Sequence, residues 1–447
     1  MRLKLRKLIC LILSAEMLIW ASGCKNSSQS ETALERTLVY TSYRDIPGVS
    51  AEELAAIEKV LGKTASFVYG MCLSTETFYN ENLEIRGYTA LLCDWLTDLF
   101  GIPFKPAIYE WGALLDGLES QTIDFSGELT ASSERRKTYI MTDAIVERSV
   151  QLIRIAKTEA QDSIARTRPL RYAFLQNSIT PTLVAPLITD QFEIVYVDNY
   201  DTVYELLKND EIDAFFDDSV AEAAFDMYSD VSVEYFSPLV YAPVSLATQN
   251  PELKPFISVI QKTIQNNDIW YIISLYNTGQ QEYMRYKFFT QLNAEERAYI
   301  EQQLKTGNAI PIAAEPDNYP ISFYNTQEKL WQGIAFDVLE EVAALTGLAF
   351  KQANDKSAEW ATLMNILETG KASLITEMIR SPERKNQFLW PDKAFVIDYY
   401  ALVSRADFPD ITISEILYNK VGLIKDSAFT ELFQNWFPDH AYTNMPA

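Results

Sequence analysis

Short apolar runs alternate along the chain with longer segments in which apolar positions recur every three or four residues. The runs 66–71, 104–109 and 123–129 are typical of buried strands, and the segments 88–100 and 111–120 have the periodicity of amphipathic helices. Strands that alternate with helices predict an open sheet with right-handed crossovers. We therefore expect an α/β fold.

The same alternation continues in a second series. Residues 149–237 contain further strand-like and helix-like segments, and the apolar run 238–248 with the helix-like segment 253–265 returns the chain to the first series. Two lobes joined by two crossing strands form a clamshell. We expect the first lobe to comprise residues 64–148 and 238–285, and the second lobe residues 149–237.

The pattern of the first lobe occurs twice. In each copy two glycines are 14 residues apart, and a tryptophan precedes an arginine by 24 residues. These residues are Gly87, Gly101, Trp111 and Arg135 in the first copy and Gly333, Gly347, Trp360 and Arg384 in the second. The repeat is too long for a solenoid, so its unit is a whole domain. We expect a clamshell at 64–285, a linker at 286–307 and a second clamshell at 308–447, with its second lobe incomplete.

The first residues have the character of an export signal. Residues 1–7 are basic, residues 8–23 are mostly apolar but short for a membrane span, and Cys24 follows small residues as in a bacterial lipobox. This predicts a lipoprotein-type signal peptide at 1–24 with lipidation at Cys24. An ordinary signal peptide or an uncleaved anchor is the alternative. Either places the remainder outside the cytoplasm, in the periplasm or anchored to the outer face of the membrane, with 25–63 as tether and lead-in.

Composition excludes several classes of function. The 447 residues are 48% hydrophobic and 13% aromatic, enough to bury the cores of two or three domains. A net charge of -23 argues against nucleic acid as a partner, because phosphates are bound by Lys and Arg. The single histidine, His440, nearly excludes a His-based triad or zinc site. We expect no metal and no cofactor.

Cys72 and Cys93 are the two cysteines outside the signal segment. In an exported protein such a pair can form a disulfide. The alternative is a core position, since Cys93 lies on the apolar helix predicted at 88–100. The sequence leaves both open.

Two motifs carry a resemblance to a known family. Residues 130–135 read Thr-Ala-Ser-Ser-Glu-Arg, close to that family's Thr-x-Thr-x-x-Arg, and residues 212–221 match its Val-Asp-Ala-x-x-x-Asp-x-x-Ala. The chain resembles the amino-acid-type extracytoplasmic solute-binding proteins (family 3), over residues 64–285 and again over 308–447. The resemblance implies two tandem bilobal domains of the type II periplasmic-binding-protein fold, with a small amino-acid-like molecule as ligand.

The resemblance also assigns ligand-binding roles in the first copy. A free amino acid offers a carboxylate, which a planar guanidinium binds in bidentate fashion, and an ammonium, which a carboxylate binds. Arg135 would hold the ligand carboxylate, with Thr130 and Ser132 adding hydroxyl groups, and Asp218 of the second lobe would hold the ammonium. Because these charges lie on different lobes, the ligand favours the closed clamshell.

Three further residues are candidates for the same pocket. Ser178 and Thr180 precede a predicted helix, whose free N–H groups favour an anion, although both could equally be simple helix caps. Glu128 lies seven residues before Arg135, as Glu377 does before its arginine, and could favour a cationic group of the ligand. The rival reading is an ion pair between Glu128 and Arg135.

The principal ligand residues have structural alternatives too. Arg135 could be a surface cation in the charged run 134–137, and Asp218 could cap the helix that follows it. Asp217 is expected to be a solvated neighbour. Trp111 and Trp360 are expected to be structural anchors rather than stacking platforms.

The second copy departs from the first. It keeps Arg384 and places Tyr319 in a Tyr-Pro-x-x-Phe segment, whose aromatic side chain often packs on the ligand in the family. It has Ile379 where the first copy has Thr130, so it lacks one hydroxyl group. We expect the first copy to hold the competent ligand site.

Tandem clamshells are similar to the extracytoplasmic part of bacterial sensor proteins. The leading hypothesis is therefore binding of a small zwitterionic solute as the sensory input of a transmembrane signalling protein with its own downstream signalling domains. The alternative is a lipid-anchored receptor that delivers an amino acid to an ABC permease. A cell-wall-active enzyme is a remote third class, and no nucleophile motif supports it, so we expect no catalytic residues.

Overall fold

The computed structural model describes residues 40–445, apart from 157, 383, 392, 395, 398–400, 425, 426 and 442. The expected signal segment, with Cys24, lies outside the described residues. The chain forms two compact units that divide between Gln291 and Leu292. Within the described residues, no helix combines the length and the apolar character that a membrane crossing requires.

The first lobe of unit 1 is built on parallel strands. Strand β1 (Phe67–Met71) lies between β4 (Phe104–Ile108) and β5 (Phe125–Thr130). Helices α3 (Tyr88–Phe100) and α4 (Trp111–Glu119) make the connections. The Phe67 ring contacts the rings of Phe104, Phe125 and Phe256 at centroid distances of 5.1, 5.4 and 5.2 Å, which anchors this sheet to its helices.

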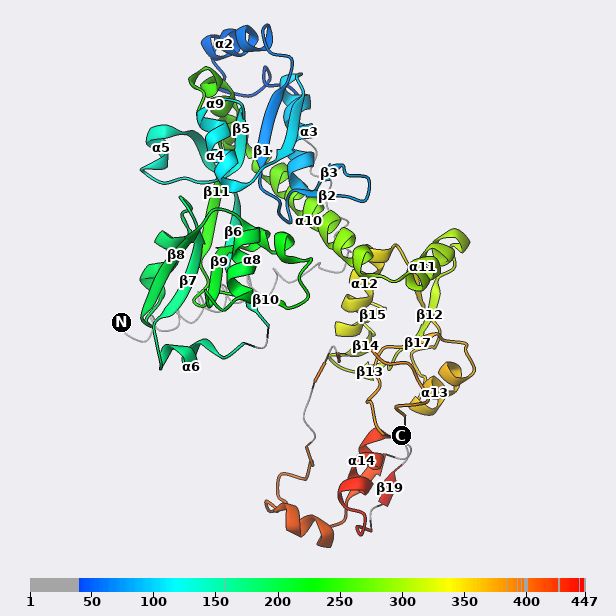
Figure 1. Cartoon of the computed structure of the whole chain (residues 1–447). Helices are drawn as coiled ribbons and strands as arrows, with labels where there is room; N and C mark the ends of the chain where they lie inside the picture. The colour runs from blue at the N-terminus through cyan, green and yellow to red at the C-terminus, as the bar shows by residue number, and fades with distance from the viewer. Residues whose placement is uncertain are drawn as a thin grey trace, which may run out of the picture. The chain divides into compact units, whose positions relative to one another are not determined.

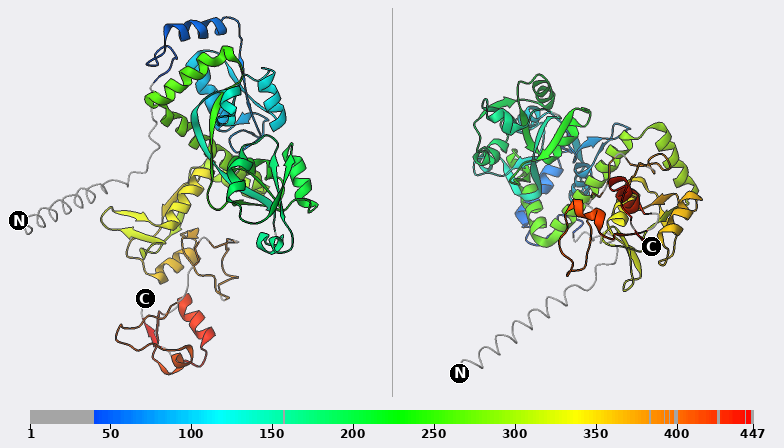
Figure 2. Two further views of the ribbon diagram at one scale, coloured as in Figure 1. Left: turned by 90° about the vertical axis from the view of Figure 1, so that its left-hand side faces the viewer. Right: turned by 90° about the horizontal axis from the view of Figure 1, so that it is seen from below.

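Two long strands connect the lobes. Residues 140–149 of β6 (Ile140–Ile155) pair antiparallel with β11 (Tyr241–Thr248), and residues 150–155 pair with strands of the second lobe. In two of the views these strands run from one lobe into the other (Figures 1 and 2). The expected lobe boundary, between residues 148 and 149, lies one residue from this change of partners. A single pleated strand therefore carries side chains of both lobes.

The second lobe is also an α/β layer. Strand β7 (Leu170–Leu175) pairs parallel with β8 (Phe192–Val197) and β9 (Ala214–Asp218), and β10 (Val231–Tyr235) pairs antiparallel with β6. Its shorter elements are α6 (Gln161–Ala165), α7 (Thr180–Val184), η1 (Ala185–Leu187), α8 (Tyr200–Lys208) and η2 (Ser219–Phe225).

Helices from both ends of unit 1 cover the first lobe. Helix α2 (Ala51–Leu61) contributes Ile57 and Val60 to the same core as α9 (Lys254–Thr263). Part of the expected lead-in is therefore a packed element rather than a tether. The remaining elements of unit 1 are β2 (Phe78–Tyr79), β3 (Ile85–Arg86), α5 (Arg135–Thr138), η3 (Pro251–Leu253), η4 (Ile264–Asp268) and α10 (Ile269–Gln291).

Unit 2 repeats the first lobe. Strand β12 (Ile310–Ala313) lies between β16 (Phe350–Gln352) and β17 (Leu374–Ile375), again in parallel. Helices α12 (Ile334–Thr346) and α13 (Trp360–Glu368) have the lengths of α3 and α4. The other elements are α11 (Ala294–Thr306), β13 (Asp317–Asn318), β14 (Ser322–Asn325), β15 (Leu330–Gln332), η5 (Ile413–Tyr418), β18 (Gly422–Ile424), α14 (Ala428–Trp436) and β19 (Thr443–Met445).

The repeated glycines mark the two ends of one helix. Gly87 and Gly333 precede α3 and α12, and Gly101 and Gly347 follow these helices in the left-handed conformation, with φ of 68° and 77°. Left-handed residues after a helix are usually glycine, because a Cβ is strained there. The constant Gly-to-Gly spacing is thus the length of one capped helix.

The structure describes the expected linker and the two cysteines that the sequence left open. The segment expected as a linker, 286–307, consists of the end of α10 and the helix α11, which Asn293 begins with a capping box. Cys72 and Cys93 are both buried thiols without a disulfide, which favours the core alternative. Burial raises the pKa of both thiols.

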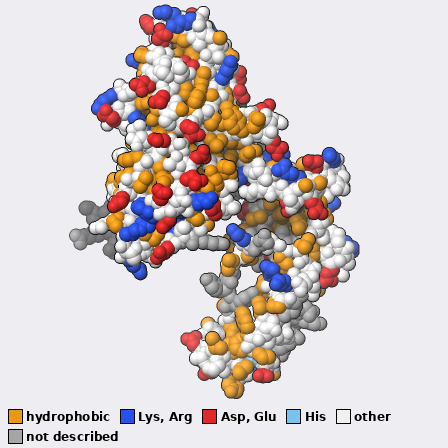
Figure 3. Space-filling model, in the orientation of Figure 1, with side chains coloured by type: hydrophobic (Ala, Val, Ile, Leu, Met, Phe, Trp, Pro, Cys, Tyr) orange, Lys and Arg blue, Asp and Glu red, His pale blue; other side chains and the backbone are white. Residues whose placement is uncertain are grey.

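The surface of unit 1 reflects the acidic composition. In the space-filling view, acidic side chains are scattered over its visible face among hydrophobic and uncharged atoms (Figure 3). This agrees with the net charge of -23 for the whole chain.

Candidate functional site

A cavity of about 40 Å³ lies between the two lobes of unit 1. It holds on the order of three waters, less than the smallest amino acid needs, so entry of such a ligand requires the lobes to separate. Its lining comes from both lobes: Cys72, Ser74, Trp111, Glu128, Thr130, Arg135, Leu175, Ser178, Ile179, Thr180, Tyr200, Asp217, Asp218, Val220 and Ala242.

Arg135 contributes a positive charge to the lining of this cavity. Its guanidinium lies 5.9 Å from the ring centroid of Trp111 and donates hydrogen bonds to the carbonyl oxygens of Thr130 (3.2 Å) and Asn177 (3.1 Å). Burial lowers the pKa of Arg135. Among the ion pairs formed by the described residues, none includes Arg135. A half-buried cation held by neutral carbonyl groups is suited to accept an anion.

Arg148 organises the acidic residues at this cavity. It is 1% exposed and comes from β6. Its Nε and Nη2 donate to the two carboxylate oxygens of Glu76 at 3.0 and 2.7 Å, and its Nη1 donates to Glu128 at 2.6 Å and to Asp218 at 2.9 Å. Burial disfavours the Arg148 cation, but the three carboxylates outweigh burial and raise its pKa. One guanidinium thus ties carboxylates of both lobes together.

Asp217 adds a fourth carboxyl group. It is 7% exposed, accepts a hydrogen bond from the Tyr200 hydroxyl (3.1 Å) and lines the cavity. Burial and the neighbouring Asp218 raise the pKa of Asp217 well above its ordinary value. The expectation that Asp217 is a solvated neighbour is wrong, because the strand β9 turns it inward.

Direct contacts hold the two lobes of unit 1 closed. The indole Nε1 of Trp111 donates to the carbonyl of Gln176 (2.7 Å), and the backbone N–H of Thr75 donates to the carbonyl of Val220 (2.9 Å). With the Arg135–Asn177 bond, these contacts join the first lobe to the second. The structure therefore represents a closed clamshell.

The other predicted residues of the first copy divide into two groups. Thr130, Ser178 and Thr180 line the cavity, and the buried Ser178 hydroxyl has no protein partner. The Ser132 hydroxyl instead accepts a hydrogen bond from the backbone N–H of Arg135 (3.0 Å) and so fixes the turn that presents the guanidinium. Helix α7, which begins at Thr180, has five residues, too few for a strong N-terminal dipole.

The alternatives for the acids are resolved by their partners. Glu128 accepts hydrogen bonds from Arg148 and from the backbone N–H of Cys72 (2.9 Å), so its ion pair is not with Arg135. Asp218 precedes η2, but its side chain makes no capping bond and binds Arg148 instead.

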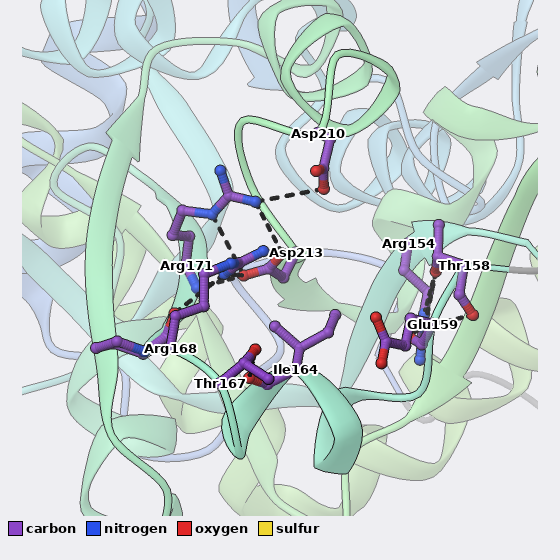
Figure 4. Close-up of polar contacts among 10 residues, drawn as sticks. Arg154, Thr158, Glu159, Ile164, Thr167, Arg168, Arg171, Asp210 and Asp213 are labelled. Carbon is purple, nitrogen blue, oxygen red and sulfur yellow. Dashed lines mark hydrogen bonds and ion pairs between the residues drawn. The ribbon is translucent and has the colours of Figure 1, made fainter.

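The aspartate of the second motif has a structural role. The carboxylate of Asp213 accepts hydrogen bonds from the Arg168 guanidinium at 2.6 and 2.7 Å and from the backbone N–H of Arg171 at 2.7 Å (Figure 4). These arginines hold the pKa of Asp213 well below its ordinary value, although burial acts against them. Asp213 thereby fixes the start of β9 against β7 and positions Asp217 and Asp218 at the far end of β9.

Unit 2 repeats the arrangement of an arginine over a tryptophan, but its arginine binds a side-chain carboxylate. Arg384 lies 5.8 Å from the ring centroid of Trp360, as Arg135 does from Trp111. Its Nη2 donates to Glu431 at 2.9 Å, and the hydroxyl of Ser381 donates to the other oxygen of Glu431 at 2.8 Å. The predicted aromatic Tyr319 is 76% exposed and packs on Phe323.

Glu315 and Glu377 of unit 2 form no ion pair among the described residues. Glu377 accepts hydrogen bonds from the backbone N–H of Glu315 (2.6 Å) and from Ser322 (2.7 Å), which matches the Glu128–Cys72 bond of unit 1. Ile397 follows Arg384 by 13 residues, the spacing at which Arg148 follows Arg135. Burial and the charge of Glu377 raise the pKa of Glu315 to about 7.

The raised pKa of Glu315 predicts a pH dependence. Unfolded Glu315 loses its proton near its ordinary pKa of 4.5, whereas the folded protein keeps it to about 7. The native state then binds more protons across this window, so we expect the free energy of unfolding of unit 2 to fall as pH rises from 4.5 to about 7. Glu315→Gln should reduce that fall, by on the order of 2 kcal/mol at pH above the window. Urea unfolding at a series of pH values measures it.

Glu341→Gln, which removes an exposed carboxyl group from α12, is the matched control. Its pH profile should follow that of the unchanged protein. Identical profiles for Glu315→Gln and the unchanged protein would contradict the prediction.

Sequence reasoning overlooked Arg148, Glu76 and Glu431. Arg148 carried a weak signal: apolar residues stand at 144–146 and at 150, but its immediate neighbours Glu147 and Ser149 are polar. Glu76 and Glu431 carried no comparable signal, because each lies in a mixed segment.

A protein-family comparison matches two segments of the chain. The family described as bacterial extracellular solute-binding proteins, family 3, matches residues 67–274 and 310–439. No curated protein matches the chain.

Solved structures give further likenesses. ArgBP from T. maritima is 18% identical, with 50% of this chain and 99% of that chain covered and a TM-score of 0.39. The amino acid ABC transporter substrate-binding protein AbpA from Streptococcus pneumoniae, bound to L-arginine, is 15% identical (50% and 98% covered, TM-score 0.42). The B. pertussis BvgS periplasmic domain is 16% identical (89% and 76% covered, TM-score 0.39).

Proposed function

The chain belongs to the bacterial extracellular solute-binding proteins, family 3, and on that premise we propose that unit 1 binds a small zwitterionic solute of amino-acid type between its lobes. The observation that carries the proposal is that both signs of charge line one cavity. Arg135 of the first lobe lines it together with the carboxyl groups of Glu128, Asp217 and Asp218, of which Asp217 and Asp218 belong to the second lobe.

The carboxylate of the solute is assigned to Arg135. Its guanidinium is already oriented by Trp111 and by the turn at Ser132. A carboxylate can replace the Asn177 carbonyl as acceptor, which exchanges a neutral hydrogen bond for a charge-assisted one. The unpartnered Ser178 hydroxyl lines the same cavity and can donate to the second oxygen.

The ammonium of the solute is assigned to the acidic side. Arg148 supplies one positive charge to Glu76, Glu128 and Asp218, and Asp217 lies beside them. Even when Asp217 holds its proton, three carboxylates share one guanidinium, so negative charge remains in excess beside the cavity. A further cationic group at this side lowers the repulsion among the carboxylates.

Binding then favours closure, because the two subsites belong to different lobes. Only the closed form brings Arg135 and Asp218 to the same ligand, so the solute shifts the open–closed equilibrium by its differential affinity. Direct contacts between the lobes also stabilise the closed form. Opening is the step that admits the solute.

Calorimetry of the full chain against a panel of L-amino acids tests the proposal. We expect at least one amino acid to bind, and Arg135→Ala to weaken its binding by about ten- to one-hundred-fold, because a charge-assisted pair is lost. Lys137→Ala is the control, since Lys137 is exposed on the same short helix and pairs with Glu134. Its affinity should equal that of the unchanged protein. No binding to any member of the panel, or equal affinity for Arg135→Ala, would overturn the proposal.

We further propose that this binding is the sensory input of a transmembrane signalling protein. Two family segments in one chain support it, because a receptor that only delivers a solute needs one clamshell. The alternative, a lipid-anchored receptor of an ABC importer, is favoured by the lipobox-like segment at Cys24. The genomic sequence decides between them: a reading frame that continues into a membrane span and a signalling domain supports the sensor, and a stop beside permease genes supports the transport receptor.

A further inference from the structure

We propose that Glu431 is a built-in occupant of the carboxylate subsite of unit 2, which an external carboxylate must displace. The inference rests on the proposed function, because the subsite is the counterpart of the one assigned to the ligand carboxylate in unit 1. It extends that function by naming a specificity-determining residue in the second copy.

Glu431 is bound by Ser381 and Arg384, which with Trp360 we call the cradle. The same three residue types recur in unit 1. Ser381 and Arg384 stand at the positions of Ser132 and Arg135, three residues apart in both copies. Arg384 lies over Trp360 as its counterpart lies over its own tryptophan. Arg384 is 7% exposed and Ser381 is 2% exposed. The recognition elements of the motif are therefore intact and buried in unit 2.

Glu431 fills this cradle as a ligand carboxylate would. One of its oxygens accepts from Arg384 Nη2 at 2.9 Å, and the other accepts from the Ser381 hydroxyl at 2.8 Å. Each oxygen of one planar carboxylate thus has its own donor. In unit 1 the corresponding arginine donates to two backbone carbonyl groups instead.

Glu431 also comes from the segment that corresponds to the ligand-capping segment of unit 1. Helix α14 follows β18, as α7 follows β7, and α7 contributes Thr180 to the cavity of unit 1. Glu431 lies in the first turn of α14, where the positive end of the helix dipole stabilises a carboxylate. Its side chain remains 26% exposed, which leaves a path for exchange with a solvent anion.

The consequence is competition. An external carboxylate can use Ser381 and Arg384 only when Glu431 has left them, so its apparent affinity is reduced by the fraction of molecules in which Glu431 is displaced. A charge-assisted pair of this kind makes that fraction about one-tenth to one-hundredth. Removing the Glu431 side chain should remove this competition.

Acetate is the probe, because it carries the carboxylate and little else. All proteins are full chains with Arg135→Ala, so that the subsite of unit 1 does not contribute. Total tryptophan fluorescence, to which Trp360 beside Arg384 contributes, follows the titration at constant ionic strength set with chloride. We expect Glu431→Ala to bind acetate at least about ten-fold more tightly than the parent with Glu431. In the Glu431→Ala protein, the further substitution Arg384→Ala should abolish this gain in acetate affinity.

A second variant guards against misfolding. Glu431→Gln keeps the shape of the side chain but loses its charge, so it should bind acetate more tightly than the parent and less tightly than Glu431→Ala. Equal acetate affinity for the parent and both Glu431 variants would overturn the proposal, as would a gain that survives Arg384→Ala. Because every protein in this set lacks Arg135, failure here is distinct from failure of amino-acid binding by unit 1.

Discussion

Replacement of Arg148 by methionine is expected to destabilise unit 1 by about 3–5 kcal/mol. The guanidinium is 1% exposed and is the ion-pair partner of Glu76, Glu128 and Asp218. Methionine fills a similar volume but leaves these carboxylates close together without a counter-charge. Breaking a buried ion network on one side is costly because the remaining charges stay desolvated.

Urea unfolding followed by circular dichroism measures the change, and hydrogen exchange of β6 and β9 assigns it to unit 1. Arg44→Met is the control, because Arg44 pairs with Glu58 where both side chains are more than half exposed. A pair of that kind contributes about 0–1 kcal/mol. Equally small losses in the free energy of unfolding for both variants would show that the charge of Arg148 does not hold the two lobes together.

Gly279→Ala is the second large effect we expect, a loss of about 3 kcal/mol or more in the stability of unit 1. Gly279 is the point where α10 approaches α3. A Cβ there would lie 2.5 Å from the Cα of Tyr88 and 2.9 Å from the carbonyl carbon of Gly87, which is closer than packed atoms approach. These neighbours are backbone atoms, so relief requires the two helices to move apart.

Gly112→Ala provides a matched glycine control. Gly112 is on helix α4, and no atom lies within 4 Å of the position of an added Cβ. Alanine favours the helix over glycine by up to about 1 kcal/mol, so this variant should be unchanged or slightly more stable. Thermal unfolding of the two variants side by side gives the comparison. Similar transition temperatures for both would show that the α3–α10 approach is looser than the structure indicates.

The two units differ in charge at corresponding positions. In unit 1, Arg135 has no side-chain anion among the described ion pairs, and Arg148 lies among the acids. In unit 2, Arg384 pairs with Glu431, and Ile397 stands at the spacing of Arg148. The two copies have thus diverged in charge at both the arginine and the acidic residues.

The repeat was readable from the sequence because its spacings reflect local structure. The distance between the paired glycines is one helix with its caps, and helix length is set by neighbours in sequence. The Trp-to-Arg spacing carries a cation–π contact of 5.9 Å in one copy and 5.8 Å in the other. Both features recur because each copy folds the same local pattern.

The sequence could not show which groups the buried charged residues pair with. Arg148 is 72 residues from Glu76 and 70 from Asp218, and no local rule links them. Asp217 and Asp218 are neighbours with the same chemistry, and only the pleat of β9 and the packing of Tyr200 make one of them the more buried.

The sequence by itself determined the α/β class, the duplication and the arginine at the centre of each repeat, because apolar periodicity, helix caps and short spacings act between residues close along the chain. Tertiary structure alone decided which carboxylates meet Arg148, that Glu431 enters the cradle of Arg384, and that the cysteines remain thiols. These outcomes depend on how lobes and helices pack, and the electrostatic energy of a buried charge is set by every group that packing brings within a few ångströms of it.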